Sequence, residues 1–429
     1  MADVKNVLVF PAGTEIAFEI YDALYRSKFV KLFGATSVPC HAEFVFENCA
    51  EEVPFPNHPD FLEKINEVVD RWHIDYIYPA HDSALLALTR LQGQLHAEVV
   101  TSALETVEIC RDKNRTYTFL AGAEYLPASY ADADAVPAYP VFIKPAVGQG
   151  SQGARRIDSR AQLEEALAEG VNYAICEYLP GEEVSVDCFT DRHGALRLAS
   201  PRSRERIRAG IAVRSRILPE DPAIAAIAAD LNRRFSFRGA WFFQIKKNAA
   251  GAYRLMEAAP RVAGTMGLTR NLGANLPLMT LFDRWGYDLD LLLNEHAQLL
   301  LDRAFISRFS SDLHYQKVYV DYDDTLTING KVNGELMRFL YQARDAGKEL
   351  ILLSRCHQDL LADMRRRAIC EGLFDQIIWL KEGEAKPDFI EGDAIFIDDS
   401  FAERRRVRDA CHIPVFDVDM VESLLDWRS

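Results

Sequence analysis

The stretch Val318-Tyr-Val-Asp321-Tyr-Asp323-Asp-Thr325-Leu326 places two carboxylates one residue apart at the end of an apolar, β-branched run. Such a run predicts a buried strand that ends in Asp-x-Asp. One carboxylate at that position can attack phosphorus while the second lies beside it, and both can face a divalent cation. Because acidic turns are common at chain reversals, this motif alone is weak evidence for a site.

The residues that follow this stretch strengthen the prediction. Further apolar runs occur at Ile351–Ser354, Phe374–Leu380 and Ala394–Ile397, and they alternate with amphipathic stretches at Gly334–Ala346 and Gln358–Cys370. This alternation predicts βα units that form a parallel sheet. Ligands of such sheets bind beyond the carboxyl ends of the strands, so we expect Asp321, Asp323, Ser354 and Asp398 to gather there.

Together with Lys386-Pro387 and the acidic pair Asp398-Asp399, this set resembles the haloacid dehalogenase superfamily of phosphatases over residues 314–429. The resemblance implies a Rossmann-like domain in which Asp321 is the nucleophile and a metal ligand. It implies that Asp323 is the general acid/base, that Ser354 and Lys386 hold the phosphate, and that Asp321, Asp323, Asp398 and Asp399 surround Mg²⁺. The short intervals between the motifs leave no room for the large cap domain of many relatives.

Composition limits the other possibilities. A chain of 429 residues predicts two or three domains, and a net charge of −15 argues against a general nucleic-acid or anionic-membrane binder. No apolar run is as long as a membrane span, and Met1-Ala-Asp-Val-Lys5 lacks a signal-peptide core. The eight cysteines form no CxxC pair, which favours reduced thiols in a cytoplasmic protein. A homodimer is the default expectation.

Residues 1–110 are predicted to form a doubly wound βα domain. Asn6–Gly13 has the pattern of a buried strand that turns through glycine into a helix, and Ile74–Pro79 is a second strand, followed by His81-Asp82. The segment lacks the GxGxxG fingerprint of dinucleotide-binding domains. We therefore interpret this domain as a scaffold that lines a substrate cleft.

The segment from residue 111 carries an ordered series of motifs. Lys113 opens a predicted helix, and Lys144 lies in a strand before the loop Val147–Ala154, whose three glycines leave backbone N–H groups free to surround a polyphosphate. Tyr173–Asp187 predicts two strands joined by an acidic hinge, where carboxylates can accept hydrogen bonds from adenine and ribose. Trp241–Ile245 and Tyr253–Arg261 place metal-ligand residue types on neighbouring strands.

This series resembles the ATP-grasp superfamily, particularly its carbamoyl-phosphate-synthetase-like members, over about residues 1–310. The resemblance implies that a carboxylate is activated as an acyl phosphate, which an amine then attacks. By resemblance, the ATP contacts are Lys113, Lys144, the loop residues Gly148, Gly150, Ser151 and Gly153, and the hinge residues Glu177, Leu179 and Glu183. Gln244 and Glu257 would bind Mg²⁺, and Arg261 would stabilise the transferring phosphoryl group.

One position departs from the family pattern. Glu-x-Asn-Pro-Arg becomes Glu257-Ala-Ala259-Pro-Arg261, so the usual asparagine ligand is replaced by a residue without a side-chain oxygen. Asn271 and Asn275 are near in sequence and are the alternatives. The remaining motifs favour an active enzyme, but a nucleotide-binding module that regulates or presents substrate to the phosphatase, or an ATP-grasp kinase, stays open.

A run of basic residues indicates where the substrate that accepts the phosphoryl group could bind. Arg202, Arg204, Arg206 and Arg208 alternate, which predicts one basic face of a strand, and Arg214 and Arg216 follow. Guanidinium groups bind carboxylates and phosphates in bidentate geometry, so this segment favours an anionic substrate over a solvated edge strand. Arg270, within Gly264–Pro277, is similar in position to a substrate-contacting residue of the family.

The expected molecule is a multidomain α/β protein. It consists of a doubly wound pre-ATP-grasp domain over 1–110, an α+β ATP-grasp domain over 111–312 and a phosphatase domain over 313–429. The expected activity is a carboxylate–amine ligase, which uses ATP and Mg²⁺ on small molecules, joined to a phosphatase that removes phosphate from the ligase's substrate or product.

Overall fold

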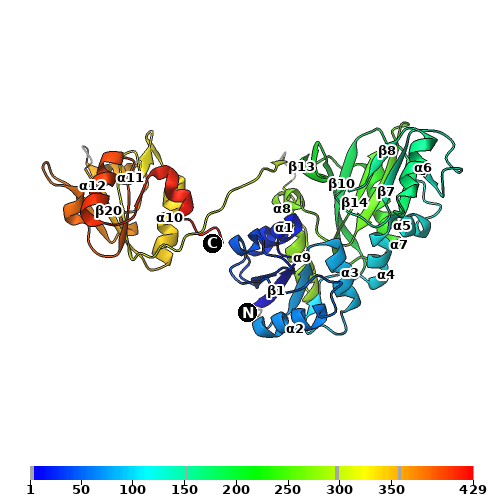
Figure 1. Cartoon of the computed structure of the whole chain (residues 1–429), viewed down its shortest axis with the longest axis horizontal. Coiled ribbons are helices and arrows are strands. Elements are labelled where there is room, and N and C mark those ends of the chain that lie inside the picture. The colour runs from blue at the N-terminus through cyan, green and yellow to red at the C-terminus, as the bar shows by residue number, and fades with distance from the viewer. Residues whose placement is uncertain (1–3, 151, 295–298, 356–358, 429) are drawn as a thin grey trace. The chain divides into compact units, whose positions relative to one another are not determined.

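The computed structural model describes residues 4–150, 152–294, 299–355 and 359–428, and it divides the chain into two compact units (Figure 1). Unit 1 is Met1–Phe305 and unit 2 is Ile306–Ser429. The division lies after residue 305, whereas the sequence placed it after residue 312. A separate domain boundary at residue 110, inside unit 1, stays a prediction.

Unit 1 begins with a five-stranded parallel sheet of order β3-β2-β1-β4-β5. Along β1, Val7 and Val9 join one buried cluster and Leu8 and Phe10 join another, so both faces of this strand are covered. The elements are β1 (Lys5–Phe10), α1 (Glu15–Leu24), β2 (Val30–Ala35), η1 (His41–Phe44), β3 (Cys49–Ala50), α2 (Phe61–Trp72), β4 (Tyr76–Pro79), α3 (Asp82–Arg90) and β5 (Glu98–Val99).

The rest of unit 1 contains two four-stranded antiparallel sheets, β6-β9-β7-β8 and β11-β10-β14-β15, and a smaller sheet, β12-β13-β16. The strands are β6 (Ser129–Tyr130), β7 (Val141–Pro145), β8 (Arg155–Ile157), β9 (Tyr173–Glu177), β10 (Glu183–Thr190), β11 (Leu196–Ser203), β12 (Arg206–Arg208), β13 (Ile211–Arg216), β14 (Gly239–Lys247), β15 (Tyr253–Ala259) and β16 (Leu300–Asp302). The helices are α4 (Leu104–Arg111), α5 (Lys113–Phe119), α6 (Arg160–Ala168), α7 (Pro222–Arg234), α8 (Gly267–Leu272) and α9 (Leu276–Arg284).

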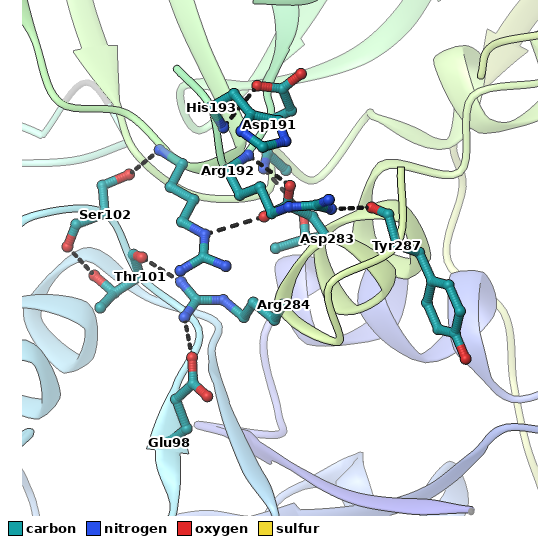
Figure 2. A network of polar contacts seen from close by, with 12 residues as sticks. Glu98, Thr101, Ser102, Asp191, Arg192, His193, Asp283, Arg284 and Tyr287 are labelled. Carbon is teal, nitrogen blue, oxygen red and sulfur yellow. Dashed lines mark hydrogen bonds and ion pairs between the residues drawn. The ribbon is translucent and has the colours of Figure 1, made fainter. Parts of the chain in front are cut away.

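The end of α9 connects the parallel sheet to the antiparallel sheet that contains β10. Arg284 donates hydrogen bonds to the Glu98 carboxylate and to the Thr101 carbonyl, beside β5 (Figure 2). The neighbouring Asp283 accepts a hydrogen bond of 2.6 Å from the backbone N–H of Arg192, in the turn after β10. Because adjacent residues of α9 contact both sheets, this helix joins them within unit 1.

Unit 2 is a five-stranded parallel sheet of order β21-β20-β17-β22-β23, which confirms the predicted parallel arrangement. The described residues between β17 and α10 form only a short hairpin, so no large cap is inserted there. The elements are β17 (Lys317–Val320), β18 (Thr327–Ile328), β19 (Lys331–Val332), α10 (Gly334–Asp345), β20 (Glu349–Ser354), α11 (Leu360–Arg366), η2 (Glu371–Leu373), β21 (Gln376–Trp379), η3 (Lys386–Phe389), β22 (Ala394–Ile397), α12 (Phe401–Cys411), β23 (Val415–Phe416) and η4 (Val418–Ser423). None of the helices among the described residues is both long and apolar enough to cross a membrane.

Candidate active sites

The glycine-rich loop of unit 1 lies between β7 and β8, beside the first turn of α5. Lys113 is the first residue of α5, and its Nζ lies 3.5 Å from the Gly148 carbonyl oxygen. Gly150 and Gly153 adopt φ angles of 59° and 70°, which glycine reaches without steric cost. Ser151 lies outside the described residues. The structure therefore brings one predicted lysine to the loop.

The turn between β12 and β13 packs closely against this loop. Gly210 has a φ of 77°, and a Cβ there would lie 2.2 Å from the carbonyl group of Gly150. Arg204 donates to the Gly210 carbonyl at 3.0 Å and forms an ion pair of 2.5 Å with Glu183. The predicted hinge residue Glu183 is thus connected, through one arginine, to the turn that packs against the loop.

Replacing Gly210 with Ala is expected to weaken ATP binding about tenfold, because the new Cβ displaces the loop at Gly150. Gly194→Ala is the matched control, since Gly194 has a φ of 80° but no atom within 4 Å of its would-be Cβ. Both variants carry the backbone cost of about 1–2 kcal/mol. Titration calorimetry with ATP distinguishes them, and equal ATP affinities in the two variants would contradict the packing argument.

Lys144, in β7, reaches across to the strand that carries Glu257. Its Nζ donates to the Met256 carbonyl at 2.7 Å and lies 5.3 Å from the centroid of the Tyr117 ring. Burial lowers the pKa of Lys144. A cavity beside this lysine is lined by residues that include Phe142, Cys176, Glu177, Leu179 and Leu255. Its volume is about 50 Å³, well below the roughly 300–1,000 Å³ of ligand pockets, so a nucleotide base would require the lining residues to move apart.

The hinge acid Glu177 ends β9. Its carboxylate accepts a hydrogen bond of 3.1 Å from the backbone N–H of Ala128 and lies 3.4 Å from Nε of Arg254. The hinge residue Leu179 lines the same cavity as Lys144. The structure therefore gathers Lys144, Glu177 and Leu179 around one cavity.

Gln244 and Glu257 lie directly opposite each other on β14 and β15, as the sequence predicted for neighbouring strands. Their oxygen atoms are the ligand type that Mg²⁺ prefers. Ala259 is buried in the core of unit 1 and offers no oxygen. The side-chain amides of Asn271 and Asn275 donate within α8 and to α1, respectively, and the Asn275 oxygen caps α9. The oxygen of Asn275 is therefore occupied and cannot replace the missing ligand, whereas the bond of Asn271 uses only its amide nitrogen, so a ligand role for Asn271 stays a prediction.

Arg261 forms a bidentate pair with Asp82, a residue that sequence reasoning did not place in the site. The guanidinium nitrogens lie 2.6 and 2.7 Å from the two carboxylate oxygens, and both side chains are largely buried. Burial works against the ionised carboxylate, but Arg261 holds the pKa of Asp82 at about 2. Asp82 and the Val262 carbonyl therefore occupy all three guanidinium nitrogens of Arg261 and fix its orientation, and its phosphoryl-binding role stays a prediction.

His81 and Ser83, on either side of Asp82, are connected to the glycine-rich loop. His81 lies 2.5 Å from the Gln149 side chain, and Arg111 donates to both the Ser83 hydroxyl at 3.2 Å and the Gly148 carbonyl at 3.3 Å. The sequence did contain a sign that Asp82 belongs to the site. His81, Asp82 and Ser83 closely follow strand β4, and ligands of parallel sheets bind at that edge.

The expectation that Arg202, Arg204, Arg206 and Arg208 share one face of a strand is wrong. Strand β11 ends at Ser203 and β12 begins at Arg206, so the chain bends between them. Most of these guanidinium groups pair with carboxylates of unit 1: Arg202 with Asp187, Arg204 with Glu183, Arg206 and Arg214 with Asp302, and Arg216 with Glu205. Arg270 likewise pairs with Glu19 at 2.9 Å. These pairs favour a structural role over an anion site.

In unit 2, three predicted residues meet at the carboxyl ends of the strands. Lys386 donates hydrogen bonds of 2.7 Å to Asp321 and 2.5 Å to Asp398, and all three side chains are buried. Burial raises the pKa of Asp321 to about 6, although Lys386 opposes this shift. Burial disfavours the charged lysine, but the two carboxylates outweigh it and raise the pKa of Lys386.

Asp321, Asp398 and Asp399 can each offer a carboxylate oxygen within 4.8 Å of the others, which fits a hard cation such as Mg²⁺. Ser354 ends the neighbouring strand β20, and its buried hydroxyl has no hydrogen-bond partner among the described residues. Asp323 is exposed and is not a member of this carboxylate set. The structure therefore brings Asp321, Lys386, Asp398 and Asp399 together, with Ser354 at the end of the neighbouring strand. Asp323 follows Asp321 by two residues at the same edge, but the predicted metal-ligand role of Asp323 is not supported, because it is not one of the clustered carboxylates.

Comparison with known proteins identifies the fold class of unit 1. Residues 171–291 match the family described as "ATP-grasp in the biosynthetic pathway with Ter operon". No curated protein matches this chain. Since the family match and the solved structures agree, unit 1 has the ATP-grasp fold, which covers about 68% of the chain.

Three solved structures are similar in fold. A Campylobacter jejuni biotin carboxylase in complex with β-γ-ATP has 14% identity and a TM-score of 0.57, covering 68% of this chain and 74% of that one. A biotin carboxylase domain of the Hydrogenobacter thermophilus 2-oxoglutarate carboxylase, with MgADP and bicarbonate, has 15% identity and a TM-score of 0.56, covering 67% and 71%. An L-amino acid ligase from Bacillus licheniformis has 17% identity and a TM-score of 0.52, covering 66% and 74%. Identities this low show the fold alone.

Proposed function

We propose that unit 1 is an ATP-dependent carboxylate–amine ligase that uses Mg²⁺ and releases ADP. The observation that carries this proposal is the pair of lysines at the glycine loop and at β15. Lys113 lies at the Gly148 carbonyl, and Lys144 lies at the Met256 carbonyl beside Glu257. Two ammonium groups, one at the glycine loop and one on the strand that precedes it, match the charge of a polyphosphate.

The proposed reaction has two steps. A carboxylate oxygen attacks the γ-phosphorus, the bond to the β,γ-bridging oxygen breaks, and ADP leaves. The amine nitrogen then attacks the acyl carbon, an amide bond forms, phosphate leaves with one former carboxylate oxygen, and the amine proton passes to solvent. Lys113 and Lys144 hold the phosphates, and Arg261, fixed by Asp82, faces the transferring group. Gln244 and Glu257 would hold Mg²⁺, which supplies charge neutralisation when bound.

The replacement at Ala259 makes the ligase activity the first point to test. We expect ADP release when the protein is incubated with ATP, Mg²⁺, a pool of small carboxylic acids and a pool of amino acids. Retained ATP binding without acid-dependent ADP release would refute the ligase and favour a nucleotide-binding module. Product mass separates a ligase from a kinase, since ligation removes water and phosphorylation adds a phosphoryl group.

We further propose that unit 2 is a Mg²⁺-dependent phosphatase of the haloacid dehalogenase type. The family match covers residues 171–291 of unit 1, so this proposal rests on the geometry of unit 2. Asp321 attacks phosphorus to form an aspartyl phosphate, the leaving oxygen takes a proton from Asp323, and water then hydrolyses the intermediate. Lys386 and the Ser354 hydroxyl bind the non-bridging oxygens.

Removal of divalent metal is expected to lower phosphate release from 4-nitrophenyl phosphate at least about 100-fold, because the clustered carboxylates would repel the substrate. EDTA treatment followed by Mg²⁺ addition tests this expectation. Phosphate release that persists after EDTA, with metal content measured by mass spectrometry, would contradict the assigned carboxylate site.

Asp82→Asn is expected to destabilise the protein, because the buried Arg261 loses its charged partner. The depressed pKa of about 2 corresponds to about 2 kcal/mol of stability. Since the folded-state pKa lies below the usual value, this contribution is present above about pH 4 and is lost as pH falls toward 2. Urea unfolding at pH 7 and pH 3 measures it. Asp290→Asn, at a fully exposed carboxylate, is the control, and an equal effect of both variants would contradict the argument.

A further inference from the structure

A large cavity lies at the carboxyl edge of the parallel sheet in unit 1. Its volume is about 1060 Å³, and its wall includes residues that follow β1, β2, β3 and β4, such as Pro11, Val38, Phe55 and His81. This edge is where open α/β sheets bind ligands. The volume is at the upper end of that found for small-molecule sites, so the cavity can hold a bulky substrate.

The wall gathers apolar side chains that are otherwise exposed to solvent. Phe55, Val38 and Val147 are 59%, 47% and 52% exposed, and they come from three separate loops. Ala84 and Ala87 of α3 line the same cavity. Exposed apolar side chains that converge on a concavity favour an apolar ligand, because burial removes their surface from water.

The arginines that line the cavity differ in whether they form ion pairs. Arg90 and Arg115 lie 2.7 and 4.0 Å from the carboxylate of Glu108, which is also part of the wall. For Arg111, the described contacts are the neutral Gly148 carbonyl and Ser83 hydroxyl. Among the described residues, no carboxylate lies within ion-pair distance of Arg111. A guanidinium whose hydrogen-bond partners are neutral, at the start of the glycine-rich loop, is complementary to a carboxylate.

We propose that this cavity binds the acid substrate of unit 1 and that the substrate is a monocarboxylic acid with a bulky apolar body. The body contacts Phe55, Val38 and Val147, and the carboxylate pairs with Arg111 beside Gly148. This inference rests on the proposed ligase function, because it places the carboxylate next to the loop assigned to ATP. It defines the chemical class of the acid by the apolar wall and by Arg111, the one arginine of the wall that has no ion pair within the described part of the chain.

Titration calorimetry on the full chain tests this proposal with three probes that separate its two parts. We expect 3-phenylpropionate to bind at least about tenfold more tightly than 3-phenylpropanamide, which lacks the charge, and than acetate, which lacks the apolar body. Val38→Asn is expected to weaken 3-phenylpropionate binding about tenfold. Val171→Asn, at a valine of similar exposure outside the cavity wall, is the matched control and is expected to change binding by less than about twofold.

Equal binding of the acid and its amide, equal binding of acetate, or an unaffected Val38→Asn variant would each overturn the proposal. A failure of this inference can be told from a failure of the ligase function. ADP release that depends on small or polar acids alone would leave the ligase standing and refute the apolar pocket. Tight 3-phenylpropionate binding without any acid-dependent ADP release would support the pocket and refute the ligase.

Discussion

Asp321→Asn is expected to lower phosphate release from 4-nitrophenyl phosphate at least about 1000-fold, because the amide is too weak a nucleophile to form the covalent intermediate. Asp321 is buried, and its carboxylate is bonded to Lys386. A neutral side chain of the same shape keeps the packing but removes the attacking charge. The measurement is the initial rate of 4-nitrophenol release with saturating Mg²⁺.

The matched control is Asp324→Asn, the same change at an exposed carboxylate three residues later. Asn also tolerates the positive φ of 55° at this position, so the control is expected to retain its rate within about threefold. Thermal unfolding of both variants shows whether the fold is intact. A folded Asp321→Asn variant with an unchanged rate would refute the nucleophile assignment.

Glu257→Gln is expected to lower acid-dependent ADP release at least about 100-fold. Glu257 faces Gln244 across the β14–β15 pair, so the change removes the only carboxylate of the proposed metal position. Because Ala259 has no side-chain oxygen, the proposed metal position already has one ligand fewer than the family pattern, and the loss of a second is expected to have a large effect. We measure ADP release by a coupled assay over a range of Mg²⁺ concentrations.

Glu182→Gln is the control for this change, because its carboxylate is largely exposed in the hinge. Its rate is expected to stay within about threefold of the unmodified chain. If Glu257→Gln keeps its rate at low Mg²⁺, another residue must hold the metal, and the proposed site is wrong.

Local patterns predicted the parts of the fold that depend on short segments. The alternation of apolar runs and amphipathic stretches after Val318 correctly indicated the parallel sheet of unit 2, since strands buried on both faces have continuous apolar runs. The same reasoning identified the facing strands that carry Gln244 and Glu257. Asp321 and Asp398 met at one edge because the carboxyl ends of parallel strands must do so.

Ion pairs between side chains that are far apart in the sequence could not be predicted from it. Asp82 and Arg261 are 179 residues apart, and neither local pattern indicates the other. The alternation of arginines from Arg202 suggested one strand, but strand continuity depends on hydrogen-bond partners that alternation does not specify. Most of these guanidinium groups pair with carboxylates, and Arg206 and Arg214 pair with the distant Asp302, which only the three-dimensional arrangement reveals.

The most direct test of the ligase mechanism follows an oxygen atom. A carboxylic acid labelled with ¹⁸O in its carboxylate is incubated with ATP, Mg²⁺ and an amine, using the Asp321→Asn variant so that unit 2 cannot exchange phosphate oxygens. Mass spectrometry of the released phosphate is expected to show one ¹⁸O atom per phosphate, because the acyl phosphate transfers it. Unlabelled phosphate, formed while ADP is released, would contradict the account.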